Sequence, residues 1–390
     1  MVGKDLIMAT LFGSGGGSSG SGGGGSGGGG SAAVSPKEVN FYDYDGTCDY
    51  AYTVAEAQAL SELPSGPAHD GLVFQGWNWS LEGVKGLTRA MNIGAMYTTD
   101  DGTTRLYITL QEGRTSPMLG VCVNGTVTVD WGDGTEPDVL TGTSVNTTKW
   151  TPNHAYAAPG DYVIRLTVDG EMAFAGNSNT HAGAYILRHS SGTHGKNAAY
   201  ANSLRRVEIG KGVELIKSYA FGDCYNVTSV TIPRGVTTIQ SDAFKNAVLF
   251  TFIIIPDSVT QLNAAAAHPQ FARGIVYHEN TSSLLRLNNA YTLAIMEIPD
   301  SVTQIAANCL YNCYSLVRVV VPRNVTYVGG FAFYGSTNLD YIDFSACTAI
   351  PSCESNSFST GVEIRVPAAL YDEWIAATNW ATYADYIKAY

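Results

Sequence analysis

Four acidic residues fall close together in the sequence and offer oxygen atoms to a cation. Asp130, Asp133, Glu136 and Asp138 lie within nine residues, and Ca²⁺ favours clustered oxygen ligands. Their spacing does not match the calcium loop of an EF-hand, and Asp133 is followed by glycine, which is a common turn pair. We therefore favour a turn here and keep a calcium site at Asp130, Asp133 and Asp138 as the weaker alternative.

A second acidic motif, residues 43–47 with the sequence DYDGT, resembles the aspartyl-nucleophile loop of haloacid-dehalogenase-type phosphatases. The resemblance implies a carboxylate nucleophile, Mg²⁺ and a lysine at the strand ends of a parallel α/β sheet. The stretch between Asp43 and Asp133 is short and rich in hairpin signals, which does not suit such a sheet. We therefore expect Asp-Gly turns at both places and no phosphatase.

Three histidines, His181, His189 and His194, fall in a connector rich in Gly, Ser and Asn, residues 176–203. Imidazole is a ligand for transition metals. However, no nearby carboxylate or cysteine completes a ligand set, so we expect a loop without a metal. No G-x-S-x-G, P-loop or dinucleotide-binding motif occurs. We therefore expect a protein that has no cofactor and is not an enzyme.

Composition narrows the classes of partner. The net charge of −12, with only 22 Lys and Arg residues, offers no basic surface of the kind that nucleic acids and anionic membranes need. No apolar run is long enough to span a bilayer. Seven cysteines, an odd number in a long chain, do not indicate a disulfide framework. We expect Cys224, Cys309 and Cys313 to be packing residues.

The elements that position any site are most clearly predicted in the C-terminal half, where a pattern repeats every 23 residues. Three apolar columns run in phase through six coils, with one longer interval between the third and fourth. The columns are Leu204, Val227, Phe250, Leu293, Leu316 and Leu339; Val207, Val230, Ile253, Met296, Val319 and Ile342; and Ile209, Ile232, Ile255, Ile298, Val321 and Phe344. Such a period predicts a solenoid whose stacked coils share one core.

A proline-containing turn follows four of the six predicted strands, as in residues 255–260 and 298–303, which both read IPDSVT. Proline suits this place because it ends strand pairing. The pattern over residues 204–367 resembles the BspA-type leucine-rich repeats of bacterial surface proteins and of proteins from gut bacteria and their phages. Residues 368–390 are expected to form an amphipathic helix that caps the last coil.

Two smaller modules are expected before the repeats. In residues 37–112 we predict a strand at 39–42, a helix from the capping box of Thr53 and Glu56 to residue 63, a second helix after Ser80, and a β-hairpin over residues 97–110. Residues 113–175 alternate like strands. Residues 131–135 (WGDGT) and 154–162 resemble the PKD type of immunoglobulin-like domain, with an edge strand missing or supplied by the preceding module.

The N-terminal residues 13–36 are mostly glycine and serine and predict a flexible linker. They separate residues 1–12, a short partly apolar peptide that we interpret as an anchor, from the rest. The expected fold is therefore mainly β: a small α+β module, a PKD-like β-sandwich, and a leucine-rich-repeat solenoid.

Strand residues between the buried columns are expected to face outward and to form a surface that is apolar at its centre. We predict ligand binding on this surface by Arg206, Phe252, Ile254, Ile295, Arg318, Val320 and Tyr341. The alternative is that residues 264–289 cover Phe252, Ile254 and Ile295.

These observations favour an adhesion or receptor-binding protein on a phage virion, as a tail or head appendage. Its expected partners are a host-surface glycan or protein, and virion proteins through residues 1–12; a homo-oligomer is possible. The lack of a convincing signal peptide favours the virion. The alternatives are an adhesin on a bacterial cell surface and a purely structural spacer protein.

Overall fold

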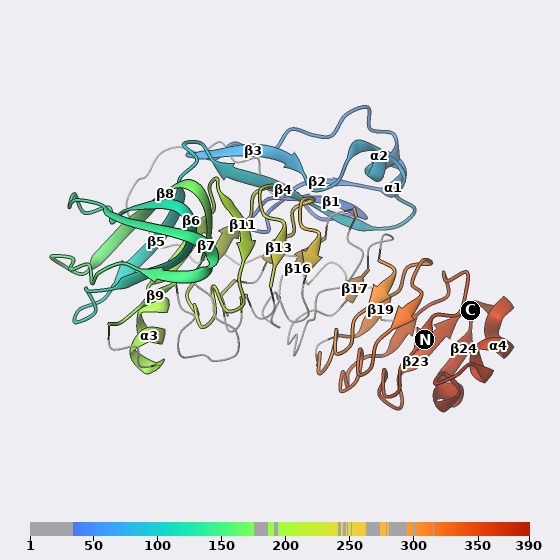
Figure 1. Cartoon of the computed structure of the whole chain (residues 1–390). Coiled ribbons are helices and arrows are strands. Elements are labelled where there is room, and N and C mark those ends of the chain that lie inside the picture. The colour runs from blue at the N-terminus through green and yellow to red at the C-terminus, as the bar shows by residue number, and fades with distance from the viewer. Residues whose placement is uncertain are drawn as a thin grey trace, which may run out of the picture.

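The computed structural model describes residues 34–174, 186–190, 194–240, 243–244, 247, 249–250, 252–262, 274–277, 279–280, 295–298, 302–314 and 316–390. Within these ranges it describes only the backbone of residues 194–196, 261–262, 274–275 and 295–297. The described chain is mainly β, as expected. Figure 1 shows a group of long strands at the left, a solenoid that runs to the right and ends in short helices, and a small N-terminal module above it.

The N-terminal module has a four-stranded sheet with the order β2-β1-β4-β3. Its elements are β1 (Val39–Tyr42), β2 (Cys48–Tyr52), α1 (Val54–Gln58), β3 (Leu72–Trp77), α2 (Leu81–Lys85) and β4 (Met91–Thr99). The capping box of Thr53 and Glu56 is present, and the Ser80 side chain caps α2. Both helices are only five residues long, so α1 ends well before the predicted residue 63.

The hairpin predicted over residues 97–110 does not form. Strand β4 pairs with β1 and β3, whereas β5 (Thr104–Leu110) pairs antiparallel with β8 and β10. The reason is burial, because Leu106, Ile108 and Leu110 all point into the apolar core that β5 shares with the solenoid. Residues 100–103 therefore carry the chain from one sheet to another.

The central strands are β6 (Met118–Asp130), β7 (Asp138–Trp150), β8 (Gly160–Phe174) and the short β9 (Leu187–Arg188). Strand β6 lies between β7 and β8. The first half of β8 pairs with β5, and its end pairs parallel with β11 (Val213–Ile216). Strand β5 is thus the additional strand supplied to this sheet from the preceding segment. Because β5 and β8 pair with β10 and β11, the central strands close both sheets of the solenoid at its first coil.

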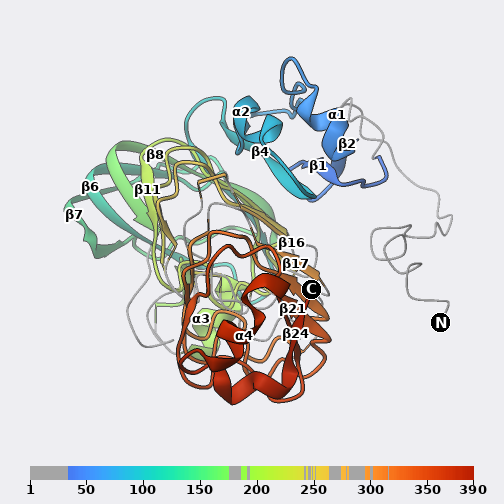
Figure 2. The same ribbon diagram turned by 90° about the vertical axis from the view of Figure 1, so that its right-hand side faces the viewer.

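The solenoid follows α3 (His194–Ala201) and has two ladders of parallel strands (Figure 2). The first ladder contains β10 (Leu204–Glu208), β12 (Ser229–Thr231), β14 (Phe252–Ile254), β16 (Gly274–Val276), β17 (Ile295–Glu297), β19 (Arg318–Val320), β21 (Tyr341–Asp343), β23 (Glu363–Val366) and β24 (Ile387–Ala389). The second contains β11, β13 (Thr238–Ile239), β15 (Gln261–Leu262), β18 (Gln304–Ile305), β20 (Tyr327–Val328) and β22 (Ser352–Cys353).

The register confirms the predicted repeat, since Arg206 pairs with Ser229 and Arg318 with Tyr341, each 23 residues on. The column residues with described side chains are all buried, and Leu293 and Met296 lie outside that set. Cys224, Cys309 and Cys313 are fully buried free thiols, as expected of packing residues. One apolar core runs from Leu106 to Ile387.

The C-terminal cap differs from the single helix that the sequence predicted. It consists of η1 (Ala368–Leu370), α4 (Tyr371–Ala376), η2 (Ala381–Tyr386) and β24. Trp374 and Trp380 are buried against Phe344 at the end of the core. Strand β24 pairs with β23, because a helix alone would leave the edge of β23 without backbone partners. Among the helices of the described residues, none has the length and apolarity needed to cross a membrane.

Candidate functional site

The predicted binding surface, the outward side of the first ladder, is divided into a covered half and an open half. Phe252 and Ile254 are only 6% and 8% exposed, so the expectation that they face solvent is wrong. The Tyr42 and Phe252 rings lie 5.4 Å apart between centroids, and a Cβ on Gly94 would lie 2.4 Å from Ile254. The N-terminal module therefore covers the apolar centre (Figure 1).

We expected the apolar centre either to bind a ligand or to be covered by residues 264–289, and not to lie under the N-terminal module. Most of residues 264–289 lie outside the described residues, but Val276 packs under the module beside Phe252 and Ile254. The Ile295 side chain also lies outside that set. Apolar side chains at the centre of the ladder therefore mark a contact within the chain, where their burial is favourable.

Hydrogen bonds between side chains and backbone join the module to the solenoid in both directions. The buried Asn78 side chain donates through Nδ2 to the Ile255 carbonyl at 2.9 Å and accepts from the Gly94 amide at 2.8 Å. Trp79 Nε1 donates to the Tyr277 carbonyl at 2.8 Å, and Arg234 Nη1 to the Gln75 carbonyl at 2.7 Å. The Arg234 hydrogen bond is exposed, but those of Asn78 and Trp79 are buried, and buried polar groups of this kind need their partners in the folded state.

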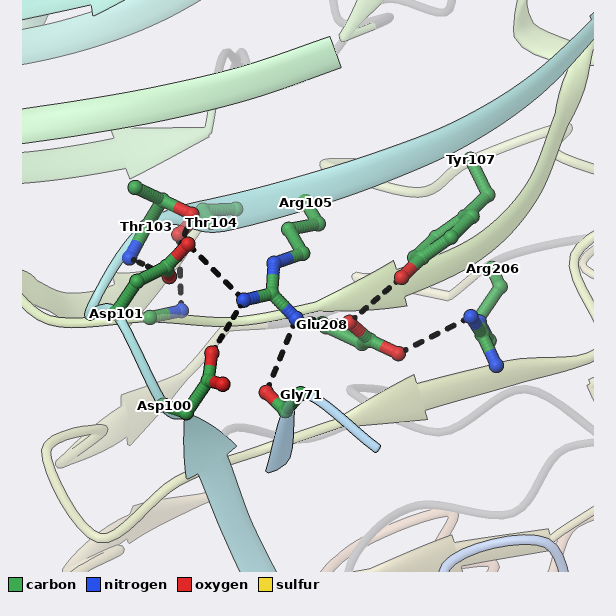
Figure 3. Close-up of polar contacts among 10 residues, drawn as sticks. Gly71, Asp100, Asp101, Thr103, Thr104, Arg105, Tyr107, Arg206 and Glu208 are labelled. Atoms are coloured by element: carbon green, nitrogen blue, oxygen red, sulfur yellow. Dashed lines mark hydrogen bonds and ion pairs between the residues drawn. The ribbon is translucent and has the colours of Figure 1, made fainter. Parts of the chain in front are cut away.

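Arg206, at the first position of the predicted surface, belongs to a polar network around the buried Glu208 (Figure 3). Glu208 is 2% exposed and accepts hydrogen bonds from the Tyr107 hydroxyl at 2.9 Å and Arg105 Nη1 at 3.4 Å. Arg206 Nη2 lies 3.2 Å from Glu208, and its guanidinium lies 3.9 Å from the Tyr107 ring centroid. Arg105 also donates to the Gly71 carbonyl. Arg206 therefore contacts β5 and its own strand β10, and Arg105 extends the network to the module.

The open half is the outward side of β19, β21, β23 and β24, which we call the open face. Its side chains are half-buried or exposed: Arg318, Val320, Tyr341, Asp343, Glu363, Arg365, Lys388 and Tyr390. The structure thus places three predicted residues, Arg318, Val320 and Tyr341, together on this surface. Whether they bind a ligand remains a prediction.

The centre of the open face is an arginine held between two tyrosines. The Arg365 guanidinium lies 3.4 Å from the Tyr341 ring centroid and 4.5 Å from that of Tyr390. Arg365 Nε donates to Glu363 Oε1 at 2.7 Å, and the Tyr390 hydroxyl donates to the same oxygen at 3.0 Å. Sequence reasoning missed Glu363, Arg365 and Tyr390, although the alternation of polar and apolar residues in EIRV, residues 363–366, signals a further strand.

Electrostatics keep this arrangement charged near neutral pH. The hydrogen bond from Arg365 lowers the pKa of Glu363, and Tyr390 contributes in the same direction. Burial opposes the charge of Arg365, but the hydrogen bond with Glu363 and the electrostatic interactions with Tyr390, Glu363 and Tyr341 together outweigh burial and raise the arginine pKa. The result is a flat guanidinium flanked by aromatic rings, which suits stacking and hydrogen bonding with a polar ligand.

The acidic residues considered for calcium are engaged with donors of the protein. Asp130 accepts from the Gly132 amide, Asp133 lies 2.8 Å from His154 Nε2, and Asp138 accepts from Trp131 Nε1 at 2.9 Å. His154 stacks on Trp131 with 4.4 Å between ring centroids. Among the residues that the structure describes, no cluster of three metal-ligating side chains occurs. The residues behind the PKD resemblance thus pack together around a turn.

The phosphatase-like motif also lacks its required setting. Asp43 is buried and lies 2.8 Å from His69 Nε2; burial raises the pKa of Asp43, although His69 opposes this. Asp43 is followed by a turn that leads into β2, and in this turn the Thr47 amide donates to the Asp45 carboxylate. The sheet around it is mixed, not parallel. Of the three connector histidines, only His189 has a described side chain.

Comparison with known proteins identifies the repeats. Residues 167–268 and 287–366 match the model of the BspA type leucine rich repeat region in 6 copies. These residues are therefore similar to BspA-type leucine-rich repeats, as the sequence pattern implied. No curated protein matches the chain.

Similar solved structures include two bacterial leucine-rich proteins. A leucine rich cell surface protein of Faecalibacterium prausnitzii is 22% identical, with a TM-score of 0.30, over 44% of this chain and 55% of that chain. A leucine-rich repeat protein from Bacteroides ovatus is 17% identical, with a TM-score of 0.34, over 52% of this chain and 64% of that chain. This chain thus spans less than two thirds of either solved chain.

Proposed function

Since its C-terminal half is similar to BspA-type leucine-rich repeats, we propose that the chain is a non-enzymatic adhesion or receptor-binding protein. The ligand is a host-surface glycan or protein, bound on the open face. The observation that carries the proposal is Arg365, held between Tyr341 and Tyr390 on the half of the ladder that the N-terminal module leaves uncovered.

The composition of the open face supports binding more than a purely structural role. Arginine and tyrosine are enriched among residues that dominate binding energies, because they combine a large flat surface with hydrogen-bonding groups. Arg365 is already held in place by Glu363, so little side-chain entropy is lost when a ligand binds. A spacer protein would have no use for this arrangement.

For the setting, we propose display on a phage virion, with residues 1–12 as the attachment peptide and residues 13–36 as the tether. Attachment to a bacterial cell surface is the alternative, and it is equally compatible with BspA-type repeats. Neighbouring genes separate the two. Tail or capsid genes beside this one support the virion, whereas a cluster of sortase substrates contradicts it.

The binding proposal is tested with the full chain on a glycan array and on candidate host cells. Tyr341→Ala combined with Arg365→Ala should lower affinity by about 100-fold, which corresponds to about 2.7 kcal/mol. Tyr225→Ala is the control, since Tyr225 is an exposed tyrosine outside the open face. Equal binding by the double variant and the unmodified protein would exclude the open face.

The non-enzymatic part is tested separately. Assays with a phosphate monoester, with and without Mg²⁺, should show no turnover. Turnover that disappears in Asp43→Asn would contradict the proposal and restore the phosphatase hypothesis.

A further inference from the structure

A hollow lies on the outward side of the sheet where β5 meets β8, at the left in Figure 1, whereas the open face lies at the right. Its volume of about 500 Å³ is in the range of sites that hold a small ligand. Strand pairing builds it, since Tyr107 lies opposite Val163 and Thr109 opposite Asp161. Ile108 between them is buried in the core, so alternate residues of each strand face the hollow.

A β-bulge in β10 adds an arginine to the lining. The step from Leu204 to Arg206 on β10 is matched by a single step on β5, so Arg205 is an extra residue in this ladder. Arg205 is half-buried and lines the hollow together with Arg165 of β8, which is exposed. Bulges are common next to functional sites because they redirect a side chain. Here the bulge brings a second guanidinium to the hollow.

These two arginines lack the acidic partners that their neighbours have. Arg105 and Arg206 both form ion pairs with carboxylates. Within the part of the chain that the structure describes, neither Arg165 nor Arg205 does so, and Arg205 Nη1 donates to the uncharged Asn202 carbonyl at 2.7 Å. A guanidinium presents a fork of N–H donors that fits a carboxylate, sulfate or phosphate. The charge of the hollow therefore suits an oxyanion.

Asp161 limits the charge of that anion. The Thr109 hydroxyl donates to Asp161 Oδ1 at 2.6 Å, and the exposed carboxylate lines the hollow. Two guanidiniums and one carboxylate leave the lining with an excess of a single positive charge. This excess matches a monoanion such as a carboxylate better than the dianion of a phosphate ester. The Asp161 carboxylate can also accept from a hydroxyl group of the ligand.

The aromatic walls of the hollow are held in place by other parts of the protein. The Tyr107 hydroxyl donates to Glu208 at 2.9 Å (Figure 3). The Tyr162 hydroxyl donates to the Ala158 carbonyl at 2.9 Å, and its ring packs on Tyr156 with 4.1 Å between centroids. Walls that are already fixed lose little entropy when a ligand binds.

We infer that this hollow binds a small monoanionic acid that carries hydroxyl groups, the chemistry of an acidic monosaccharide. Arg165 and Arg205 hold its carboxylate, Asp161 accepts from one of its hydroxyl groups, and the two tyrosine rings form the walls. The hollow is separate from the open face, so either proposal can fail without the other.

The test is titration calorimetry of the full chain with galacturonate, glucuronate and N-acetylneuraminate, with galactose as the neutral probe and glucose phosphate as the dianion. At least one carboxylated sugar should bind, and it should bind more tightly than galactose and glucose phosphate. Arg165→Gln should lower its association constant about ten-fold, as expected for the loss of a hydrogen bond between charged groups. The melting temperature should not change, because the Arg165 side chain is exposed. Arg205→Gln should also weaken binding.

Arg323→Gln is the matched control. Arg323 is an exposed arginine on a turn of the solenoid, so the net charge changes by the same amount outside the hollow, and binding should be unchanged. Asp161→Asn should strengthen the binding of glucose phosphate relative to that of the carboxylated sugar, because it removes the charge that disfavours a dianion.

The inference is overturned if no carboxylated sugar binds, if galactose or glucose phosphate binds the unmodified chain equally well, or if Arg165→Gln and Arg323→Gln bind alike. It is also overturned if Tyr341→Ala combined with Arg365→Ala abolishes binding of the carboxylated sugar, because the acid would then lie on the open face.

Discussion

At the scale of the residue, Glu208 shows how one buried charge can join three parts of a chain. Its carboxylate accepts from Tyr107 and lies next to Arg105 and Arg206, and Arg105 in turn reaches the Gly71 carbonyl of the N-terminal module. A buried carboxylate is tolerated only when such partners replace the water it has lost. The network therefore specifies how the module, β5 and β10 fit together.

Removing this carboxylate should be costly. Glu208→Ala removes the acceptor of the Tyr107 hydroxyl and a counter-charge of Arg206, whereas Arg105 keeps Asp100 and Asp101 as partners. It should lower the free energy of unfolding by about 1–2 kcal/mol, as measured by urea denaturation. Glu208→Gln should have a smaller effect because it keeps an acceptor. Glu214, which is exposed on β11, provides the control Glu214→Ala. A loss in Glu208→Ala no larger than that in the control would show that the network contributes little.

The contacts of Arg105 with Asp101 also predict a dependence of stability on pH. Burial opposes the ionisation of Asp101, but hydrogen bonds from Thr103 and Arg105 outweigh it and hold the pKa of Asp101 at about 2. Because the pKa is lower in the folded state, this stabilisation is complete above about pH 4. It is lost as the pH falls towards 2. Between these values the melting temperature of Asp101→Asn should fall less steeply than that of the unmodified protein; parallel curves would contradict the assignment.

At the scale of the element, the C-terminal cap determines how firmly the last coils are closed. Trp374→Ala removes a ring that packs on Phe344 and Trp380, and the loss of such a buried ring typically costs about 3–5 kcal/mol. In a solenoid this loss acts on the nearest coils. Hydrogen exchange should therefore accelerate in β23 and β24, while β10 and β12 keep their protection. Equal acceleration along the whole array would contradict a local cap.

The elements differ in how far the sequence predicted them. The repeat was predictable because apolar residues recur at the same positions every 23 residues in successive coils, so the local sequence pattern agrees with the fold. The pairing of β5 was not, because its partners β8 and β10 lie far along the chain and its alternation fits a hairpin equally well. Phe252 and Ile254 are apolar residues at outward positions, which suggested a binding surface. The same apolar character explains why they are buried in a contact within the chain. Arg318, Val320 and Tyr341 lie half-buried on the open face, and their role in binding stays a prediction.

At the scale of the whole molecule, the N-terminal module and the solenoid form one unit through the cluster around Phe252. Cys48 belongs to this cluster and is 5% exposed, and burial raises the pKa of its thiol to about 11. Phe252→Ala should weaken the contact and speed the reaction of Cys48 with a thiol reagent, located by mass spectrometry. Phe358→Ala, which alters the far end of the core, should leave the Cys48 rate unchanged. An unchanged Cys48 rate in Phe252→Ala would show that the module does not depend on this contact.

The footprint of the module also limits how arrays of this design can vary in length among related proteins. Its contacts extend along the solenoid from Arg234, through Ile255 and Tyr277, to the Ile298 carbonyl, which accepts from Arg89. A coil inserted within this interval would move one set of partners by a full strand spacing, about 4.8 Å. A coil inserted beyond Ile298 would move only the open face and the cap. Gains and losses of coils are therefore expected C-terminal to Ile298, so the reach of the binding surface can evolve while the attachment of the module stays fixed.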